Sequence, residues 1–106
     1  MPFPRLEPER IRVHPLGERM SKTAIREVAV DPEQEPQEAP EIAVLARETA
    51  ERVLSARARG ASVILAFGAH LIKNGAAPLV IRMMEEGWIT HLATNGAGAI
   101  HDWEFA

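Results

Sequence analysis

Hydrophobic side chains are concentrated after residue 40, and their spacing there predicts helices that alternate with strands. Between residues 41 and 60, side chains recur at intervals of three and four positions, which places them on one face of a helix. These side chains are Ile42, Leu45, Ala46, Thr49, Val53 and Leu54. Pro40 suits the first turn of this helix and Gly60 suits its end. The pattern therefore predicts one long helix with an apolar face.

Two short apolar runs follow, at residues 62–67 and 88–94, and each predicts a strand. The first run is continuous, as is typical of a strand buried on both faces of a parallel sheet. A helix with Pro78 near its start separates the runs, and a further helix begins at Ala99. The predicted fold class is α/β: a partial Rossmann-like parallel sheet, made of a β-α-β unit preceded by a helix, over residues 41–106.

The first 40 residues have a different character. Seven of the eight prolines lie there, and residues 31–40 carry no large apolar side chain. Such a composition cannot offset the entropy lost on ordering, so residues 1–40 are predicted to form an extended, Pro-rich arm and linker. Within it, residues 11–14 alternate like a short edge strand, and residues 22–30 fit either a short strand or a helical turn.

Composition sets the broad class of the protein. The 106 residues suffice for one modest core, and the net charge of −3 gives no reason to expect a nucleic-acid partner. The chain has no cysteine, no apolar run long enough for a membrane span and no apolar N-terminal stretch typical of a signal peptide. We therefore expect a cytoplasmic protein without membrane or nucleic-acid partners.

The predicted sheet has two open edges, because two parallel strands alone lack neighbours on both sides. The missing elements then come from another copy of the chain, or from a longer protein of which this chain is a part. The sequence favours the second, with a truncation at the C-terminus, since the last predicted helix has barely begun at Ala106.

Polar, glycine-containing loops follow both predicted strands, at residues 68–75 and 94–102. Open parallel sheets bind ligands beyond the carboxyl ends of their strands. Glycine lets the backbone approach a ligand closely, and free N–H groups at a helix start favour an anion such as pyrophosphate. The alternative is that Gly96 and Gly98 only shape a tight turn, since a lone Gly-x-Gly is not the dinucleotide fingerprint. Composition alone leaves these interpretations equal.

The histidines offer a second candidate site. His70, His101 and Asp102 could converge at the strand ends as part of a metal site, but no pair has the His-x-x-x-His spacing of two ligands on one helix face. No metal ligand is therefore assigned. His91 lies inside a predicted strand, where a hydrogen-bonded core histidine is expected.

Two stretches together resemble deoxyhypusine synthase: Phe-Gly-Ala-His-Leu-Ile-Lys-Asn-Gly at residues 67–75 and Ile-Thr-His-Leu-Ala-Thr-Asn-Gly-Ala-Gly-Ala-Ile-His-Asp at residues 89–102. In that family, a loop ending in Asn-Leu-Ile-Ser-Ser-Gly follows one strand, and Thr-Thr-Ala-Gly-Gly with an acidic cluster follows the next. Order, spacing and the Leu-Ile-x-x-Gly core match over about 40 residues. The chain looks most like the N-terminal NAD-binding part of the prokaryotic deoxyhypusine synthase-like relatives.

The resemblance implies a specific activity for the longer parent protein. The family uses NAD to oxidise spermidine, then transfers the aminobutyl group to a lysine of a translation factor. Its members are tetramers with active sites between subunits, so a homo-oligomer (dimer or tetramer) is expected here. The NAD contacts implied for this chain are Ala69, His70, Leu71, Ile72, Thr94, Asn95, Gly96 and Ala97.

The resemblance also implies polyamine contacts at His101 and Asp102. The family has two adjacent glutamates where this chain has Ile100 and His101, and only the acid at Asp102 is retained. The nucleophilic lysine of the family comes after this region, so no catalytic residue is assigned and the isolated chain is expected to be inactive. The alternative hypothesis is a non-catalytic nucleotide-binding or oligomer-assembly module.

Overall fold

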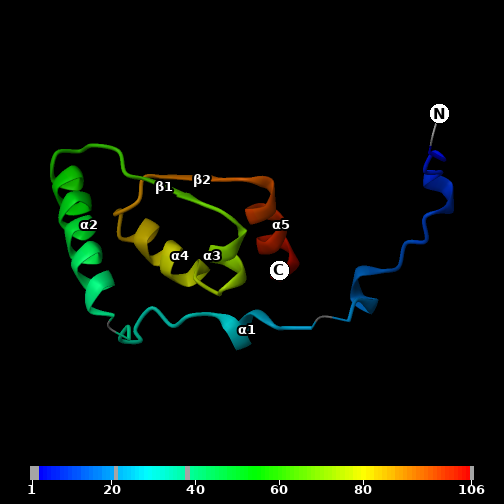
Figure 1. Cartoon of the computed structure of the whole chain (residues 1–106), viewed down its shortest axis with the longest axis horizontal. Coiled ribbons are helices and arrows are strands. Elements are labelled where there is room, and N and C mark those ends of the chain that lie inside the picture. Colours follow the sequence, from blue (N-terminus) through cyan, green and yellow to red (C-terminus); the bar gives the residue numbers. More distant parts are fainter. Residues whose placement is uncertain (1–2, 21, 38, 106) are drawn as a thin grey trace.

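The computed structural model of the chain describes residues 3–20, 22–37 and 39–105 (Figure 1). In chain order, its 3₁₀ helices (η), α-helices and strands are η1 (Pro8–Arg10), η2 (Leu16–Glu18), α1 (Ile25–Val28), α2 (Pro40–Ala58), β1 (Ile64–Phe67), α3 (Ala69–Lys73), α4 (Ala77–Glu85), β2 (His91–Thr94) and α5 (Gly96–Phe105). The two strands are parallel neighbours in one small sheet. The fold is therefore mixed helix and strand, compatible with the predicted partial α/β class.

Two threonines of the second strand segment fix the register of the sheet, in which Phe67 pairs with Thr94. At one end, Thr90 Oγ1 accepts the Val63 N–H at 2.9 Å and lies 3.0 Å from the Val63 carbonyl oxygen. At the other end, Thr94 Oγ1 donates to the Phe67 carbonyl oxygen at 2.9 Å. A shift of one residue would break the contacts at both ends.

The second strand starts later than the sequence predicts. The pattern placed a strand over residues 88–94, whereas β2 begins at His91. The N–H groups of Trp88 and Ile89 donate to the Met83 carbonyl oxygen at 2.8 and 3.2 Å, so they close the end of α4 and are not free for the sheet. Hydrogen bonding at a helix end therefore competes with strand pairing here.

The strands are also less buried than predicted. In β1, Leu65 and Phe67 are half-buried while Ile64 is exposed, and every residue of β2 is exposed. The prediction of a strand buried on both faces was wrong, because the described chain supplies helices to one face of the sheet only (Figure 1). The same exposure corrects the prediction for His91, whose Nδ1 lies 2.8 Å from Thr90 Oγ1 at the surface.

The hydrophobic core is small. Among the described residues, the buried large apolar side chains are Ile72 of α3, Val80 of α4 and Ile89, which precedes β2. Helices α3 and α5 pack against each other and α5 also contacts β2. The core therefore lies where α3, α4 and α5 meet the sheet, and α2 lies outside it (Figure 1).

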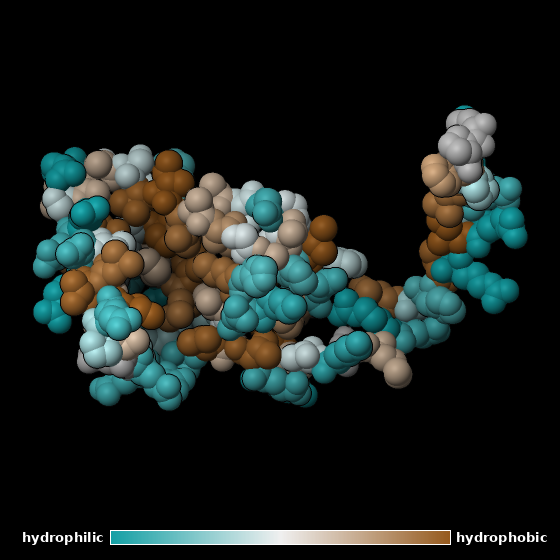
Figure 2. Space-filling view, in the orientation of Figure 1, coloured by the Kyte–Doolittle hydropathy of each residue, from teal (hydrophilic) through white to brown (hydrophobic). Residues whose placement is uncertain are grey.

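The molecule is open for its size. Its radius of gyration is 19.3 Å, whereas a compact chain of this length has about 13 Å. The accessible surface is 9393 Å², against about 5,900 Å² for a folded monomer of this mass. Figure 2 shows much hydrophobic surface over α2 and the neighbouring part of the body. Among the described helices, none is long and apolar enough to cross a membrane.

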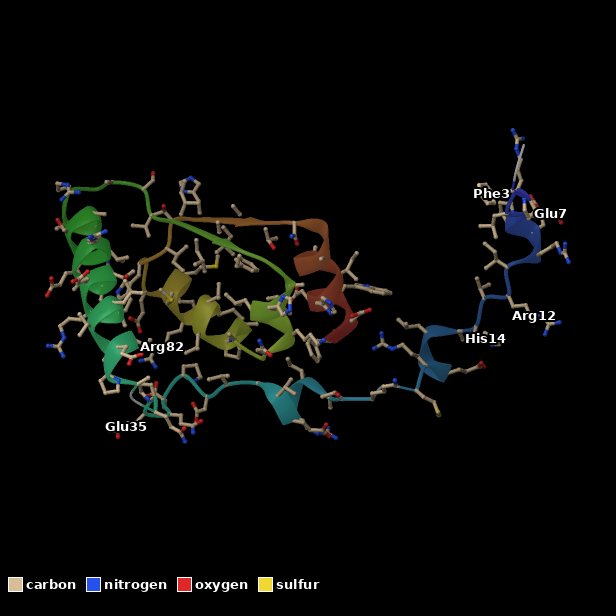
Figure 3. The ribbon with its side chains drawn as sticks, in the orientation of Figure 1. Phe3, Glu7, Arg12, His14, Glu35 and Arg82 are labelled. Atoms are coloured by element: carbon tan, nitrogen blue, oxygen red, sulfur yellow. The ribbon has the colours of Figure 1, made fainter. Side chains whose placement is uncertain are left out.

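In residues 3–20 and 22–37, the regular elements are the short helical turns η1, η2 and α1. Residues 11–14, predicted as an edge strand, form no strand, because no strand of the described chain lies beside them to accept its hydrogen bonds. For residues 22–30 the structure selects the helical turn, α1, whose first turn is held by Glu27 Oε2 accepting the Ala24 N–H at 3.2 Å. The part of the segment with Phe3 and His14 projects away from the body (Figure 3).

Other parts of this segment are attached to the body. The Val30 N–H donates to the Gly75 carbonyl oxygen at 2.9 Å, in the turn between α3 and α4. Arg82 of α4 is ion-paired with Glu33 at 2.5 Å and with Glu86 at 3.0 Å. The hydrogen bond to Glu86 and the charges of both carboxylates raise the pKa of Arg82 above its ordinary value. Residues 30–33 are thus tied to the turn between α3 and α4 and to α4 itself.

Candidate functional site

The carboxyl ends of β1 and β2 lie side by side, and each strand continues almost at once into a helix. Gly68 is the N-cap of α3, and Asn95 stands between β2 and α5. The Thr94 hydroxyl joins the two strand ends through the Phe67 carbonyl. A Cβ placed on Gly68 would lie 4.0 Å from Asn95 Nδ2, so the two junctions are in contact distance. This is the edge at which the sequence predicts a ligand site.

The second junction is built by Asn95. Its side-chain Oδ1 accepts the Gly98 N–H at 3.1 Å, and its carbonyl oxygen lies 3.0 Å from the same N–H. Asparagine is among the best N-cap residues, because its side chain satisfies an N–H group that the first turn leaves unpaired. The helix therefore begins at Gly96, and the predicted start at Ala99 was wrong.

The two glycines of the predicted Gly-x-Gly loop differ in their surroundings. Gly98 is buried, and a Cβ there would collide with Thr94 Oγ1, which is fixed by its bond to Phe67. At Gly96, no atom of the described residues lies within 4 Å of a Cβ, and the φ angle is not in the left-handed region. Packing thus explains Gly98, whereas neither packing nor backbone conformation requires glycine at Gly96.

The residues that resemblance assigns to NAD fall into two groups. Thr94, Asn95, Gly96 and Ala97 are exposed together at the junction of β2 and α5. The others lie in α3, a helix where the sequence suggested a loop: Ala69 and Leu71 are half-buried, His70 is exposed and Ile72 is buried. The Ile72 side chain is 7% exposed and belongs to the core. The structure therefore brings the two groups to one edge, with the β2–α5 group the more accessible.

The residues assigned to the polyamine lie further along α5. His101 is half-buried, and its Nδ1 is 3.0 Å from Glu104 Oε2, while Asp102 is exposed. Five residues along an α-helix span about 7.5 Å, which separates His101 from the helix start at Gly96. Across residues 3–20, 22–37 and 39–105, no group of three histidine, aspartate or glutamate side chains lies close enough to hold a metal ion.

His101 instead faces a hollow of about 510 Å³ that the sequence analysis did not anticipate. Lys73 at the end of α3 and Arg19 and Lys22 of the N-terminal segment also line it. The Arg19 guanidinium donates to the Glu104 carbonyl oxygen at 2.9 Å, which holds that segment against α5. The only sequence signal was the presence of basic residues in a segment interpreted as a linker.

Comparison of the chain with protein-family models, with curated proteins and with solved structures gave no match in any of the three. Fold and site together define a protein of mixed helix and strand with one pair of parallel strands. Two strand–helix junctions are exposed at the carboxyl ends of these strands. The resemblance to deoxyhypusine synthase stays a prediction from the sequence motifs.

Proposed function

We propose that the carboxyl edge of β1 and β2 binds NAD, and that the chain is part of a deoxyhypusine synthase-like transferase that moves the aminobutyl group of a polyamine. The observation that supports this most is the open space at Gly96, at the start of a helix that adjoins a second strand–helix junction. A side chain there would leave the protein's own packing undisturbed, so the glycine suits the approach of a ligand.

The pyrophosphate of NAD would lie against the first turn of α5. The N–H groups of Gly96 and Ala97 belong to that turn, where helical N–H groups have no intrahelical acceptor. The Gly98 N–H is already bonded to Asn95. The partial positive charge at a helix N-terminus favours an anion in this position. Gly68, next to Asn95, leaves the neighbouring junction similarly open to the dinucleotide.

The transferase activity belongs to the proposed parent protein. In this chain, the Asp102 carboxylate is the exposed acid that would attract a cationic amine, and His101 is already paired with Glu104. The deoxyhypusine synthase-like resemblance places the nucleophilic lysine beyond this region. We therefore expect the chain alone to bind NAD without turnover.

The proposal is tested by titrating the purified chain with NAD while following tryptophan fluorescence and melting temperature. A ligand that binds only the folded state stabilises it by about 2.7 kcal/mol at 100 times its Kd. Gly96→Val should abolish this response without lowering the stability of the free chain. Gly17→Val is the matched control, because no described atom lies within 4 Å of a Cβ there either.

A saturable response that Gly96→Val removes and Gly17→Val preserves would support NAD binding at the junction. An identical response from both variants would place the dinucleotide elsewhere on the chain. A folded chain that shows no response to NAD would contradict the proposal.

A further inference from the structure

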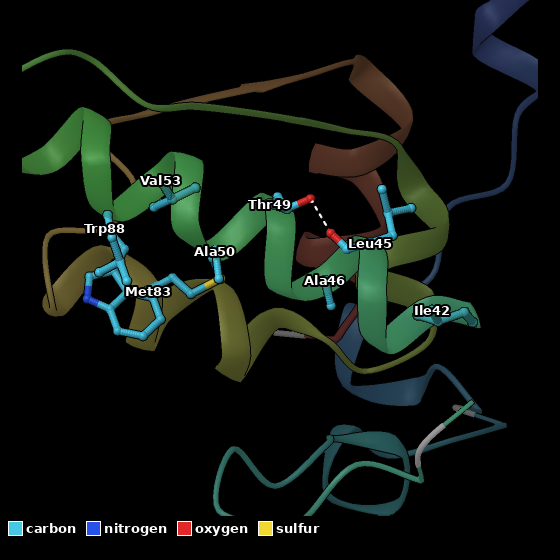
Figure 4. A pocket seen from close by; sticks show the side chains of 9 residues that line it. Ile42, Leu45, Ala46, Thr49, Ala50, Val53, Met83 and Trp88 are labelled. Atoms are coloured by element: carbon cyan, nitrogen blue, oxygen red, sulfur yellow. Dashed lines mark hydrogen bonds between the residues drawn. The ribbon is translucent and has the colours of Figure 1, made fainter. Parts of the chain in front are cut away.

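Two of the hollows in the described chain differ in the chemistry of their walls. In the one that runs along α2, Met83 and Trp88 face this helix (Figure 4). Its polar side-chain groups are the Trp88 indole and the Thr49 hydroxyl, and the hydroxyl donates to the Leu45 carbonyl oxygen at 2.8 Å. Neither group is charged, so this wall offers little that would select one ligand over another. The second hollow, by contrast, is lined by charged side chains.

The second hollow, here called the basic hollow, lies between the N-terminal segment and the helices α3 and α5. Its ionisable side chains are those of Arg19, Lys22, Lys73, His101 and Glu104. In Figure 1, the stretch of the N-terminal segment between η2 and α1 passes beside the C-terminal end of α5 and closes one side of the hollow. The volume of about 510 Å³ lies within the range of about 300–1,000 Å³ that is typical of small-molecule sites.

The chain contains two lysines, and both of them line the basic hollow. Lys22 precedes α1, and Lys73 is the last residue of α3. Within residues 3–20, 22–37 and 39–105, neither ammonium group has a hydrogen-bond or ion-pair partner. An ammonium group carries three N–H donors and no acceptor. Both lysines are therefore available to bind an anion in the hollow.

Positive charge exceeds negative charge in the basic hollow. The three cationic side chains of Arg19, Lys22 and Lys73 stand against the one carboxylate of Glu104, which leaves a surplus of two. That carboxylate also lies 3.0 Å from His101 Nδ1. The chain as a whole has a net charge of −3, so the surplus is local to this hollow. A hollow lined by charge of one sign attracts ligands of the opposite sign.

The ends of the neighbouring helices explain one of these cations. Basic side chains often bind the carbonyl groups at the C-terminal end of a helix. Arg19 does so, because its guanidinium donates to the Glu104 carbonyl oxygen at 2.9 Å, in the last turn of α5. Lys73 donates to no carbonyl oxygen of the described residues, and Lys22 lies in no helix. Helix capping therefore does not account for the two lysines.

We propose that the basic hollow binds a small phosphate monoester, with the phosphate group between Lys22 and Lys73. A phosphate monoester carries a charge of about −1.5 to −2 at pH 7, which matches the surplus of two positive charges. Lysine is a common ligand of phosphate in proteins. Met20, Val28 and Phe105 also line the hollow and supply apolar surface for the organic part of the ester.

This inference does not depend on NAD binding, because the basic hollow shares no residue with the β2–α5 junction. It changes the role of His101, which the resemblance to deoxyhypusine synthase assigned to a polyamine. A hollow with a surplus of positive charge repels a polycation. Asp102, the other residue of that assignment, does not line the hollow and stays available to an amine.

The test is a calorimetric titration of the purified chain with phenyl phosphate at low ionic strength. We expect saturable binding that weakens as sodium chloride is added, because salt screens the charges. Lys22→Gln and Lys73→Gln should each weaken binding by about tenfold, through loss of a charge-assisted hydrogen bond, and Lys73→Arg should preserve it. Arg26→Gln is the matched control, since it removes the same charge from α1, outside the hollow, and should leave binding unchanged.

Two comparisons make the test specific. Gly96→Val should bind phenyl phosphate as the wild type does, which separates this site from the proposed NAD site. Benzoate, which carries one negative charge on the same ring, should bind more weakly than phenyl phosphate. The proposal is overturned if a folded chain shows no binding of phenyl phosphate up to about 10 mM. It is also overturned if Arg26→Gln weakens binding as much as Lys73→Gln does, because net charge alone would then explain the effect.

Discussion

The contact between the N-terminal segment and the turn after α3 gives a quantitative prediction through Gly75. Its φ angle is +76°, in the region that residues with a Cβ rarely adopt. A Cβ there would also collide with the Val28 carbonyl group. Two residues further on, the Val30 N–H donates to the Gly75 carbonyl oxygen at 2.9 Å. Gly75→Ala therefore imposes two separate costs, one conformational and one steric.

The matched control is Gly60→Ala at the end of α2. Gly60 has a similar φ angle of +67°, but no described atom lies within 4 Å of a Cβ there. The left-handed conformation alone costs about 1–2 kcal/mol in either variant. In Gly75→Ala, displacement of residues 28–30 also breaks the Val30 hydrogen bond, which adds about 1 kcal/mol.

Unfolding by urea, followed by circular dichroism, measures both changes in the free energy of unfolding. We expect Gly75→Ala to be the more destabilised by at least about 1 kcal/mol, a difference of about 4–8 °C in melting temperature for a domain of this size. Hydrogen exchange at the Val30 amide should accelerate in Gly75→Ala only. Equal destabilisation with an unchanged exchange rate at Val30 would refute the contact between the segment and this turn.

Three further substitutions test other contacts. Asn95→Ala should destabilise the chain by about 1 kcal/mol through loss of the N-cap of α5, measured by urea unfolding; an unchanged midpoint would mean that the cap does not form. Thr90→Val should lower the melting temperature more than Thr23→Val, because the Thr90 hydroxyl bonds to the backbone of Val63, just before β1. Thermal unfolding of the two variants tests this, and equal melting temperatures would contradict it. Arg82→Met should speed hydrogen exchange at Glu33, since it removes the ion pair to that residue; unchanged exchange would show that the pair does not order the segment.

Local signals sufficed to predict part of the fold from the sequence. The helix of α2 is confirmed, since its periodic apolar positions, Pro40 in the first turn and Gly60 after the end all act within the segment itself. The parallel order of β1 and β2 is likewise confirmed. Elsewhere, distant or competing contacts decide the outcome. Trp88 enters no strand because its N–H bonds to the end of α4, and this competition leaves no trace in the hydrophobic pattern.

Burial was the least predictable property. The apolar run of β1 suggested that helices cover both faces of the sheet, but β1 alternates between exposed and half-buried residues. How much of a strand is buried depends on distant elements, which the pattern of the strand itself does not specify. Both predicted loops begin at one edge of the sheet, as the parallel pairing of β1 and β2 requires, and ligand binding at that edge stays a prediction. The start of α5 at Gly96 was missed, because glycine is a poor helix former and the Asn95 cap was interpreted as part of a turn.

The most direct test of NAD binding is a titration of the isotope-labelled chain with NAD, followed by the shifts of its backbone amide signals in nuclear magnetic resonance spectra. The account predicts saturable changes at the amides of Gly68, Asn95, Gly96 and Ala97, with a common dissociation constant. The amide of Gly17, which lies outside the site, should not move. Changes confined to other parts of a folded chain, or no change at any NAD concentration, would contradict the account.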